Sequence, residues 1–131
     1  MTRSLLSAVA LVAAGLLVLL AAAQSEAANI AVGGTKGWTY GLNTWKPNTP
    51  VRAGDVLVFN WKGGHDVWLM KDAPAYKACN FGTAKRKAPM TFGGKYRFPV
   101  PVTAKGKTLY FGCGVYGHCA GNMKVAIPIQ K

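Results

Sequence analysis

Glycine and proline interrupt the sequence beyond residue 27 so often that it leaves little room for a long helix. The chain has sixteen glycines and seven prolines, and they separate short runs rich in Val, Phe, Tyr and Trp. Short β-type runs divided by turn residues at this spacing are typical of a β-sandwich, and the apolar residues show almost no helical periodicity. The sequence therefore predicts an all-β domain with little helix.

The run DVLVFNW is the clearest predicted strand. Leu57, Phe59 and Trp61 should face one side of it, while Val56 and Val58 face the other. Side chains alternate between the two faces of a strand, and the residues on both faces of this one are apolar. A strand that is apolar on both faces is buried on both, so we expect it to lie at the centre of the fold.

Two further runs predict strands in the last part of the chain. KTLYFGC places Phe111 and Cys113 on one face, and the final apolar run groups Val125, Ile127 and Ile129. The stretch over residues 71–90 is the longest irregular one, with a helical turn expected around Tyr76. Its basic run, Lys85-Arg86-Lys87, is expected to be a solvated loop.

The first 27 residues predict a secretory leader. Arg3 precedes an apolar run from Leu5 to Ala23, and small and polar residues follow. The run is close to membrane-spanning length, so an anchor is the alternative, but the polar break favours cleavage. We expect a mature start at Ala28, with processing after Ala23 as the other possibility. We therefore expect one domain over residues 28–131. We also expect an extracellular location, which would be the cell wall if the source is a plant.

The chain is strongly basic, with 16 Lys and Arg, 4 Asp and Glu and a formal net charge of +12. Such a charge attracts polyanions in a salt-dependent way. An exported protein seldom meets nucleic acid, so we expect an acidic polysaccharide or an acidic protein as partner and no nucleic acid. Solubility is an equally good explanation. No apolar tail follows residue 130, so no membrane anchor is expected, and we expect a monomer.

The stretch CGVYGHCAGNM, residues 113–123, holds two of the three cysteines. Three cysteines cannot all pair with one another, and an odd cysteine in a secreted protein suggests a thiol kept for another purpose. Cys113 ends a predicted strand just before a glycine-bounded loop, whereas Cys79 lies in the long irregular stretch and could be joined to Cys119. We therefore expect Cys113 to be the free thiol.

Cys113 has potential partners at close spacing. His118 follows it by five residues, Met123 by ten, and the other histidine of the chain is His65. Two imidazoles and a thiolate with a weak axial thioether are the blue-copper ligand set, whereas structural zinc prefers four strong ligands. Met123 would fill the position that a catalytic metal leaves open, which argues against an enzyme. Taken singly, each residue is more often structural: His65 could be a turn residue beside two glycines.

The sequence resembles the phytocyanins, plant blue-copper proteins of the cupredoxin fold. The similarity includes VGGTKGW, VRAGDVLVFNW with the histidine after it, YKACN, and LYFGCGVYGHCAGNMKVAI. The Cys-x4-His-x4-Met spacing is similar to this family and differs from the shorter loop of plastocyanin. The implied fold is a cupredoxin-like Greek-key β-sandwich or barrel of two sheets. The resemblance implies four copper ligands and one disulfide: His65, Cys113, His118 and Met123, and Cys79 with Cys119.

Methionine at position 123 resembles the plantacyanin, or basic blue protein, branch, whereas stellacyanin-like members usually have glutamine. One departure is Tyr116, where many members have proline. The resemblance implies a secreted type 1 copper protein that moves one electron as copper cycles between Cu(I) and Cu(II), with an unknown redox partner and no enzymatic activity. The alternative is a basic module that binds the extracellular matrix or cell wall, in which copper is secondary.

Overall fold

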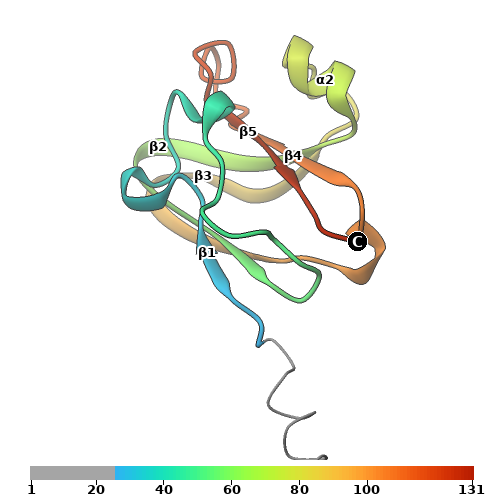
Figure 1. The fold of residues 1–131 in the computed structure, drawn as a ribbon. Coiled ribbons are helices and arrows are strands. Elements are labelled where there is room, and N and C mark those ends of the chain that lie inside the picture. Colours follow the sequence, from blue (N-terminus) through green and yellow to red (C-terminus); the bar gives the residue numbers. More distant parts are fainter. Residues whose placement is uncertain (1–25) are drawn as a thin grey trace, which may run out of the picture.

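A computed structural model describes residues 26–131, so the expected leader lies outside the described residues except for its last two positions. Strands dominate this part, which confirms the all-β prediction (Figure 1). The described strands are β1 (Asn29–Ala31), β2 (Val56–Met70), β3 (Lys85–Pro99), β4 (Thr108–Gly112) and β5 (Lys124–Pro128). The described helices are α2 (Ala73–Ala78) and three single 3-10 turns, η1 (Gly34–Lys36), η2 (Leu42–Thr44) and η3 (Val102–Ala104).

Strand β2 is the centre of the sheet, as its sequence predicts. On one side it pairs along most of its length with β3, in antiparallel register. On the other side its beginning pairs in parallel with β1, and its end pairs antiparallel with β4, which in turn pairs with β5. Because β2 belongs to both halves, the strands form one continuous curled sheet, which is consistent with the expected sandwich or barrel (Figure 1).

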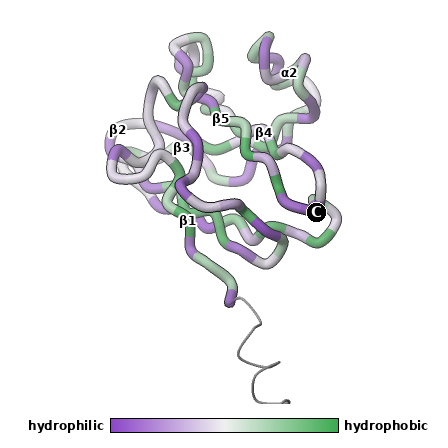
Figure 2. The backbone as a smooth tube through the Cα atoms, viewed as in Figure 1, coloured by the Kyte–Doolittle hydropathy of each residue, from purple (hydrophilic) through white to green (hydrophobic). Residues whose placement is uncertain are grey.

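The concave side of this sheet holds the apolar core. Leu57 and Phe59 of β2 are fully buried, and the Phe59 ring contacts Trp38 and Phe111 at centroid distances of 5.2 and 5.0 Å. Val58, on the opposite face of β2, is buried as well, as expected for a strand that is apolar on both faces. Apolar residues also lie along strands β4 and β5 (Figure 2).

The helical turn expected around Tyr76 is confirmed. It is α2, a short helix of six residues. Asp72 caps it, because its carboxylate accepts a hydrogen bond of 3.0 Å from the Ala75 N–H. The helix ends at Cys79, whose φ of 51° is left-handed and turns the chain back. No helix in residues 26–131 is long and apolar enough to cross a membrane.

The expectation of a solvated loop at Lys85-Arg86-Lys87 is wrong, because these residues begin strand β3. Arg86 lies opposite Trp68 and Lys85 opposite Leu69. Within the described sheet β3 pairs only with β2, so it is an outer strand whose side chains can stay in water. Lys85 and Arg86 are exposed despite their strand geometry. Charged residues on an outer strand also discourage pairing with another chain.

Candidate metal centre

His65 lies within strand β2, not on a turn between strands, so the expectation of a turn beside Gly63-Gly64 is wrong. The register between β2 and β3 shifts between Trp61 and Gly64, and again between His65 and Val67. Gly63 supplies a left-handed φ of 77° inside this irregular part. Such bulges twist a strand and redirect its side chains. The Gly63-Gly64 pair thus resembles a turn in the sequence, yet the bulges keep this part of the chain in the sheet. They also set the direction of the His65 side chain.

The other three sulfur and imidazole side chains lie between β4 and β5 and are ordered by backbone turns. The N–H of Cys113 donates to the carbonyl of Met123 at 3.0 Å, and the N–H of Met123 donates to the carbonyl of His118 at 3.0 Å. The N–H of His118 donates to the carbonyl of Val115, also at 3.0 Å. These bonds close the segment on itself, so residues five apart in the sequence lie side by side.

The strand and the segment bring three ligand atoms together. Nδ1 of His65 lies 3.1 Å from Nδ1 of His118, and the Sγ atom of Cys113 lies 3.5 Å from the His118 nitrogen and 3.9 Å from the His65 nitrogen. Metal bonds to nitrogen and thiolate sulfur of about 2.0–2.3 Å give ligand-to-ligand separations of this size. The three atoms therefore fit around one ion. Met123 is fully buried in the same apolar core as Cys113.

Burial sets the protonation of the ligands before a metal binds. It raises the pKa of the Cys113 thiol to about 11, because a thiolate is poorly solvated in the core. Burial, followed by the charge of the neighbouring His118, lowers the pKa of His65. At neutral pH the His65 ring is thus neutral and offers a lone pair. The thiol must lose its proton to a bound cation, which metal binding commonly achieves.

The disulfide expected between Cys79 and Cys119 is present, with a Cα–Cα distance of 5.9 Å. It joins the end of α2 to the residue that follows His118, so it ties the ligand segment to a second part of the chain. Cys113 is the free cysteine of the described residues and is fully buried. The sequence prediction of which thiol stays free is confirmed.

Asp66 is the residue of this site that the sequence reasoning missed. Its carboxylate accepts a hydrogen bond of 2.6 Å from the N–H of Gly114, the residue after Cys113, and only 7% of Asp66 is exposed. Its carbonyl accepts a bond of 2.9 Å from the indole N–H of Trp38. Asp66 therefore links the strand that carries His65 to the segment that carries the thiol. The available signal was its rarity, since it is one of four acidic residues in the chain.

A buried thiol facing two imidazoles, beside a buried methionine in a curled β-sheet, defines the mononuclear blue-copper class of site. Comparison with known proteins agrees with this class of site. The family described as plastocyanin-like domain matches residues 35–123. Chemocyanin of Lilium longiflorum is 35% identical over 103 residues, which cover 79% of this chain and 76% of that protein. A basic blue protein of Cucumis sativus is 31% identical over 96 residues, 73% of this chain and 93% of that protein.

Among solved structures, the cucumber basic protein, a blue copper protein, superposes with a TM-score of 0.62 at 32% identity, over 77% of this chain and 98% of that one. The chain belongs to the phytocyanins, within the plastocyanin-like domain family. Four of its side chains form a copper-binding site: His65, Cys113, His118 and Met123.

Proposed function

We propose that this protein transfers single electrons and catalyses no reaction on a substrate. The observation that carries the proposal is the closed ligand triangle of Cys113, His65 and His118, whose atoms lie 3.1–3.9 Å apart around space for one ion. Copper bound there supplies one-electron Cu(I)/Cu(II) chemistry, and soft sulfur ligands favour the reduced state. Met123, which is fully buried in the same core, would be the fourth ligand, and its thioether would leave no open position for a substrate.

The protein's own part is to hold the ligands still. His65 is fixed by the pairing of β2, and the backbone of Cys113 is bonded to Met123. Side chains that are already in place need to move little when the charge at the site changes, which keeps electron transfer fast. The buried position of Cys113 also keeps water away from its sulfur.

Electrons should enter and leave at His118. This imidazole is partly exposed, whereas His65 is buried, with only 8% of its surface exposed. The ring of Tyr40 lies 5.2 Å from the His118 ring, and Tyr116 on the same segment is fully exposed. One aromatic ring thus lies beside the accessible imidazole, and a second, fully exposed ring is on the same segment as His118. Both rings can offer an apolar contact to a redox partner, and the small Gly117 lets that partner approach closely.

The same proposal places the protein outside the cell. A leader-like sequence at residues 1–27 and a disulfide both suit an exported protein. Expression of the full chain in a plant secretory system should yield a product that begins at Ala28, as read by mass spectrometry of the secreted protein. A product that keeps its first residues and stays in the membrane fraction would contradict export.

Copper titration tests the function directly. Addition of Cu(II) to the metal-free protein should produce an intense visible thiolate-to-copper band, and voltammetry of the product should show a reversible one-electron couple. The Cys113→Ser variant should lose the band completely while circular dichroism shows an unchanged fold, because a hydroxyl does not replace the thiolate. A colourless wild-type product would remove the copper assignment. A coloured product that turns over dioxygen or superoxide would contradict the non-enzymatic role alone.

A further inference from the structure

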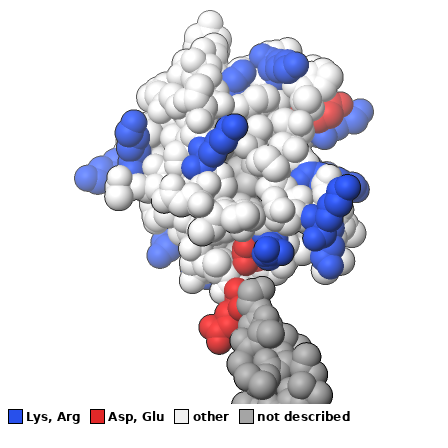
Figure 3. Space-filling view, in the orientation of Figure 1, with Lys and Arg blue, Asp and Glu red and all other residues white. Residues whose placement is uncertain are grey.

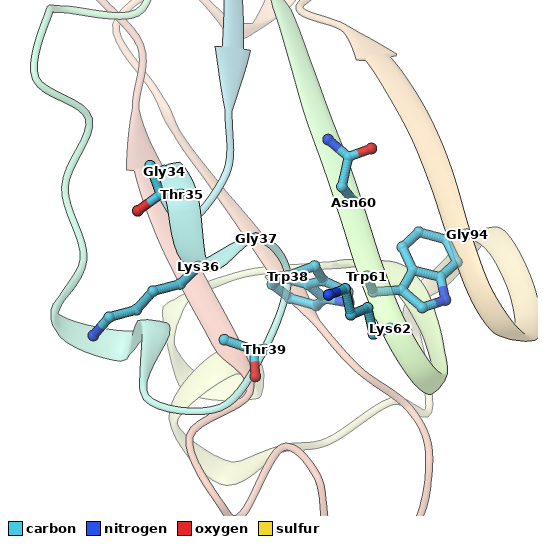
Figure 4. Close-up of a pocket in the computed structure, with 10 residues that line it drawn as sticks. All are labelled: Gly34, Thr35, Lys36, Gly37, Trp38, Thr39, Asn60, Trp61, Lys62 and Gly94. Atoms are coloured by element: carbon cyan, nitrogen blue, oxygen red, sulfur yellow. The ribbon is translucent and has the colours of Figure 1, made fainter.

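A groove of about 560 Å³ lies between the turn at η1 and strand β2 (Figure 4). Lys36 and Thr39 line it from the η1 side, and Asn60 and Lys62 line it from β2. None of the four copper ligands is among its lining residues. It is therefore a feature separate from the metal centre, although His65 lies only three residues beyond Lys62.

The η1 turn and β2 meet at the groove through a close backbone contact. The N–H of Trp38 donates to the carbonyl of Asn60 at 2.7 Å, which draws the η1 turn against β2. A side chain at Gly37 would place its Cβ 2.6 Å from that same carbonyl, and Gly37 has a left-handed φ of 73°. A Cβ at Gly94 would clash with the ring of Trp61. Glycine at positions 37 and 94 therefore allows the close packing of the backbone beside the groove.

The polar groups around the groove match one kind of ligand. Two amino groups, two threonine hydroxyls and a side-chain amide line it, and no carboxylate does. Lys36, Lys62 and Asn60 are exposed, so their polar ends can reach a ligand. A ligand that offers carboxylates together with many hydroxyls would satisfy all of these groups. Those are the groups of a uronic acid sugar chain.

The shape and the overall charge favour the same ligand. The volume lies within the range of about 300–1,000 Å³ that is usual for sites that enclose a small molecule or segment, whereas protein partners meet over broader surfaces. The chain has a net charge of +12, and Lys and Arg are spread widely over the face seen in Figure 3. That field raises the local concentration of any polyanion near the groove.

We propose that this groove binds a short run of an acidic polysaccharide. The amino groups of Lys36 and Lys62 pair with two uronate carboxylates, and Thr39 and Asn60 hydrogen-bond to sugar hydroxyls. The site is independent of electron transfer, and its occupant would hold the protein on an extracellular polysaccharide.

Calorimetric titration of the copper-loaded protein with an oligogalacturonate of defined length tests this site. The Lys36→Gln/Lys62→Gln double variant should bind about fivefold to thirtyfold more weakly, as expected for two exposed charged contacts. The matched control is Lys105→Gln/Lys107→Gln, which removes the same charge from two exposed lysines that do not line the groove. That control should change the affinity by less than about twofold at physiological salt, where distant charges are screened. An unchanged visible band in both variants reports an intact fold.

Three results would overturn the proposal. The first is no measurable binding of oligogalacturonate by the wild-type protein. The second is an equal loss of affinity in the two double variants, which would mean that net charge alone attracts the polyanion. The third is equally strong, equally groove-dependent binding of a polyglutamate peptide of the same charge, which would reassign the groove to an acidic protein. A neutral galactose oligomer should not bind.

Discussion

The copper ligands come from two regions that are built in different ways. His65 belongs to β2, a strand paired with residues distant in sequence, and its neighbours Asp66 and Val67 are buried. The other three ligands, at positions 113, 118 and 123, lie on one segment held by short-range backbone bonds, and several residues of that segment are exposed. One ligand therefore depends on the sheet as a whole, and three depend on local turns.

This difference assigns distinct tasks to the contacts that join the two regions. The disulfide Cys79–Cys119 anchors the ligand segment to the end of α2, and Asp66 anchors its beginning to β2. The hydrophobic core, the pairing of β4 with β5 and a bond of 3.1 Å from the N–H of Leu42 to the carbonyl of Asn122 also hold the segment. The position of the ligand segment relative to His65 should thus be sensitive to both links.

Removal of the disulfide should have the largest effect. A Cys79→Ala/Cys119→Ala variant loses a cross-link between residues 40 apart. By chain-entropy reasoning, a closed loop of that length contributes about 4 kcal/mol to the free energy of unfolding. Denaturant unfolding of the metal-free variant should show a loss of about 3–4 kcal/mol, and copper should leave the site faster than in the wild type.

The control is the wild-type protein with its disulfide reduced, which lacks the cross-link but keeps both sulfur atoms. It should lose nearly as much stability as the double variant. A loss below about 1 kcal/mol in both would show that local turns alone hold the ligand segment, and the two regions would then need no covalent link.

Asp66→Ala should have the next largest effect. The substitution removes the buried carboxylate that accepts a hydrogen bond from the Gly114 N–H and leaves that N–H without its side-chain partner. A hydrogen bond to a charged group contributes about 1.5–3 kcal/mol, so unfolding should become easier by that amount. The visible band should also shift or broaden, because Gly114 directly follows the thiolate ligand.

The matched control is Asp66→Asn, which keeps an oxygen acceptor in the same place but removes the charge. It should retain more than half of the stability that Asp66→Ala loses. Equal losses in the two variants would mean that the charge of Asp66, not its hydrogen bond, joins the two regions. Urea unfolding and the absorption spectrum distinguish these outcomes.

The two regions also differ in how well the sequence predicts them. The ligand segment was predicted closely, because its soft side chains are rare and closely spaced, and local turns keep neighbours in sequence close in space. The identity of the free thiol, Cys113, and the disulfide partner of Cys79 follow from that pattern. The core strand was predicted as well, since Leu57 and Phe59 show the alternation of a buried strand.

The β2–β3 region was predicted less well because its features depend on long-range pairing. Gly63-Gly64 resembles a turn, and only the bulged pairing with β3 keeps His65 in the sheet. Lys85 and Arg86 resemble a loop, and only their position on an outer strand explains them. The role of Asp66 depends on the approach of Gly114, which no local pattern reveals. Long-range register is the information that a single sequence carries least clearly.

The smallest expected effect concerns Tyr116, where many phytocyanins have proline. Tyr116 is fully exposed, and within residues 26–131 its N–H donates no backbone hydrogen bond. A proline there restricts the unfolded chain and should raise the free energy of unfolding by about 0.4–1 kcal/mol without moving the visible band. Tyr116→Ala, which removes the ring alone, should change stability by less than about 0.5 kcal/mol. A destabilising Tyr116→Pro would show that Val115 cannot adopt the extended backbone that proline requires of the residue before it, and that the local turns of the ligand segment tolerate less variation than their exposure implies.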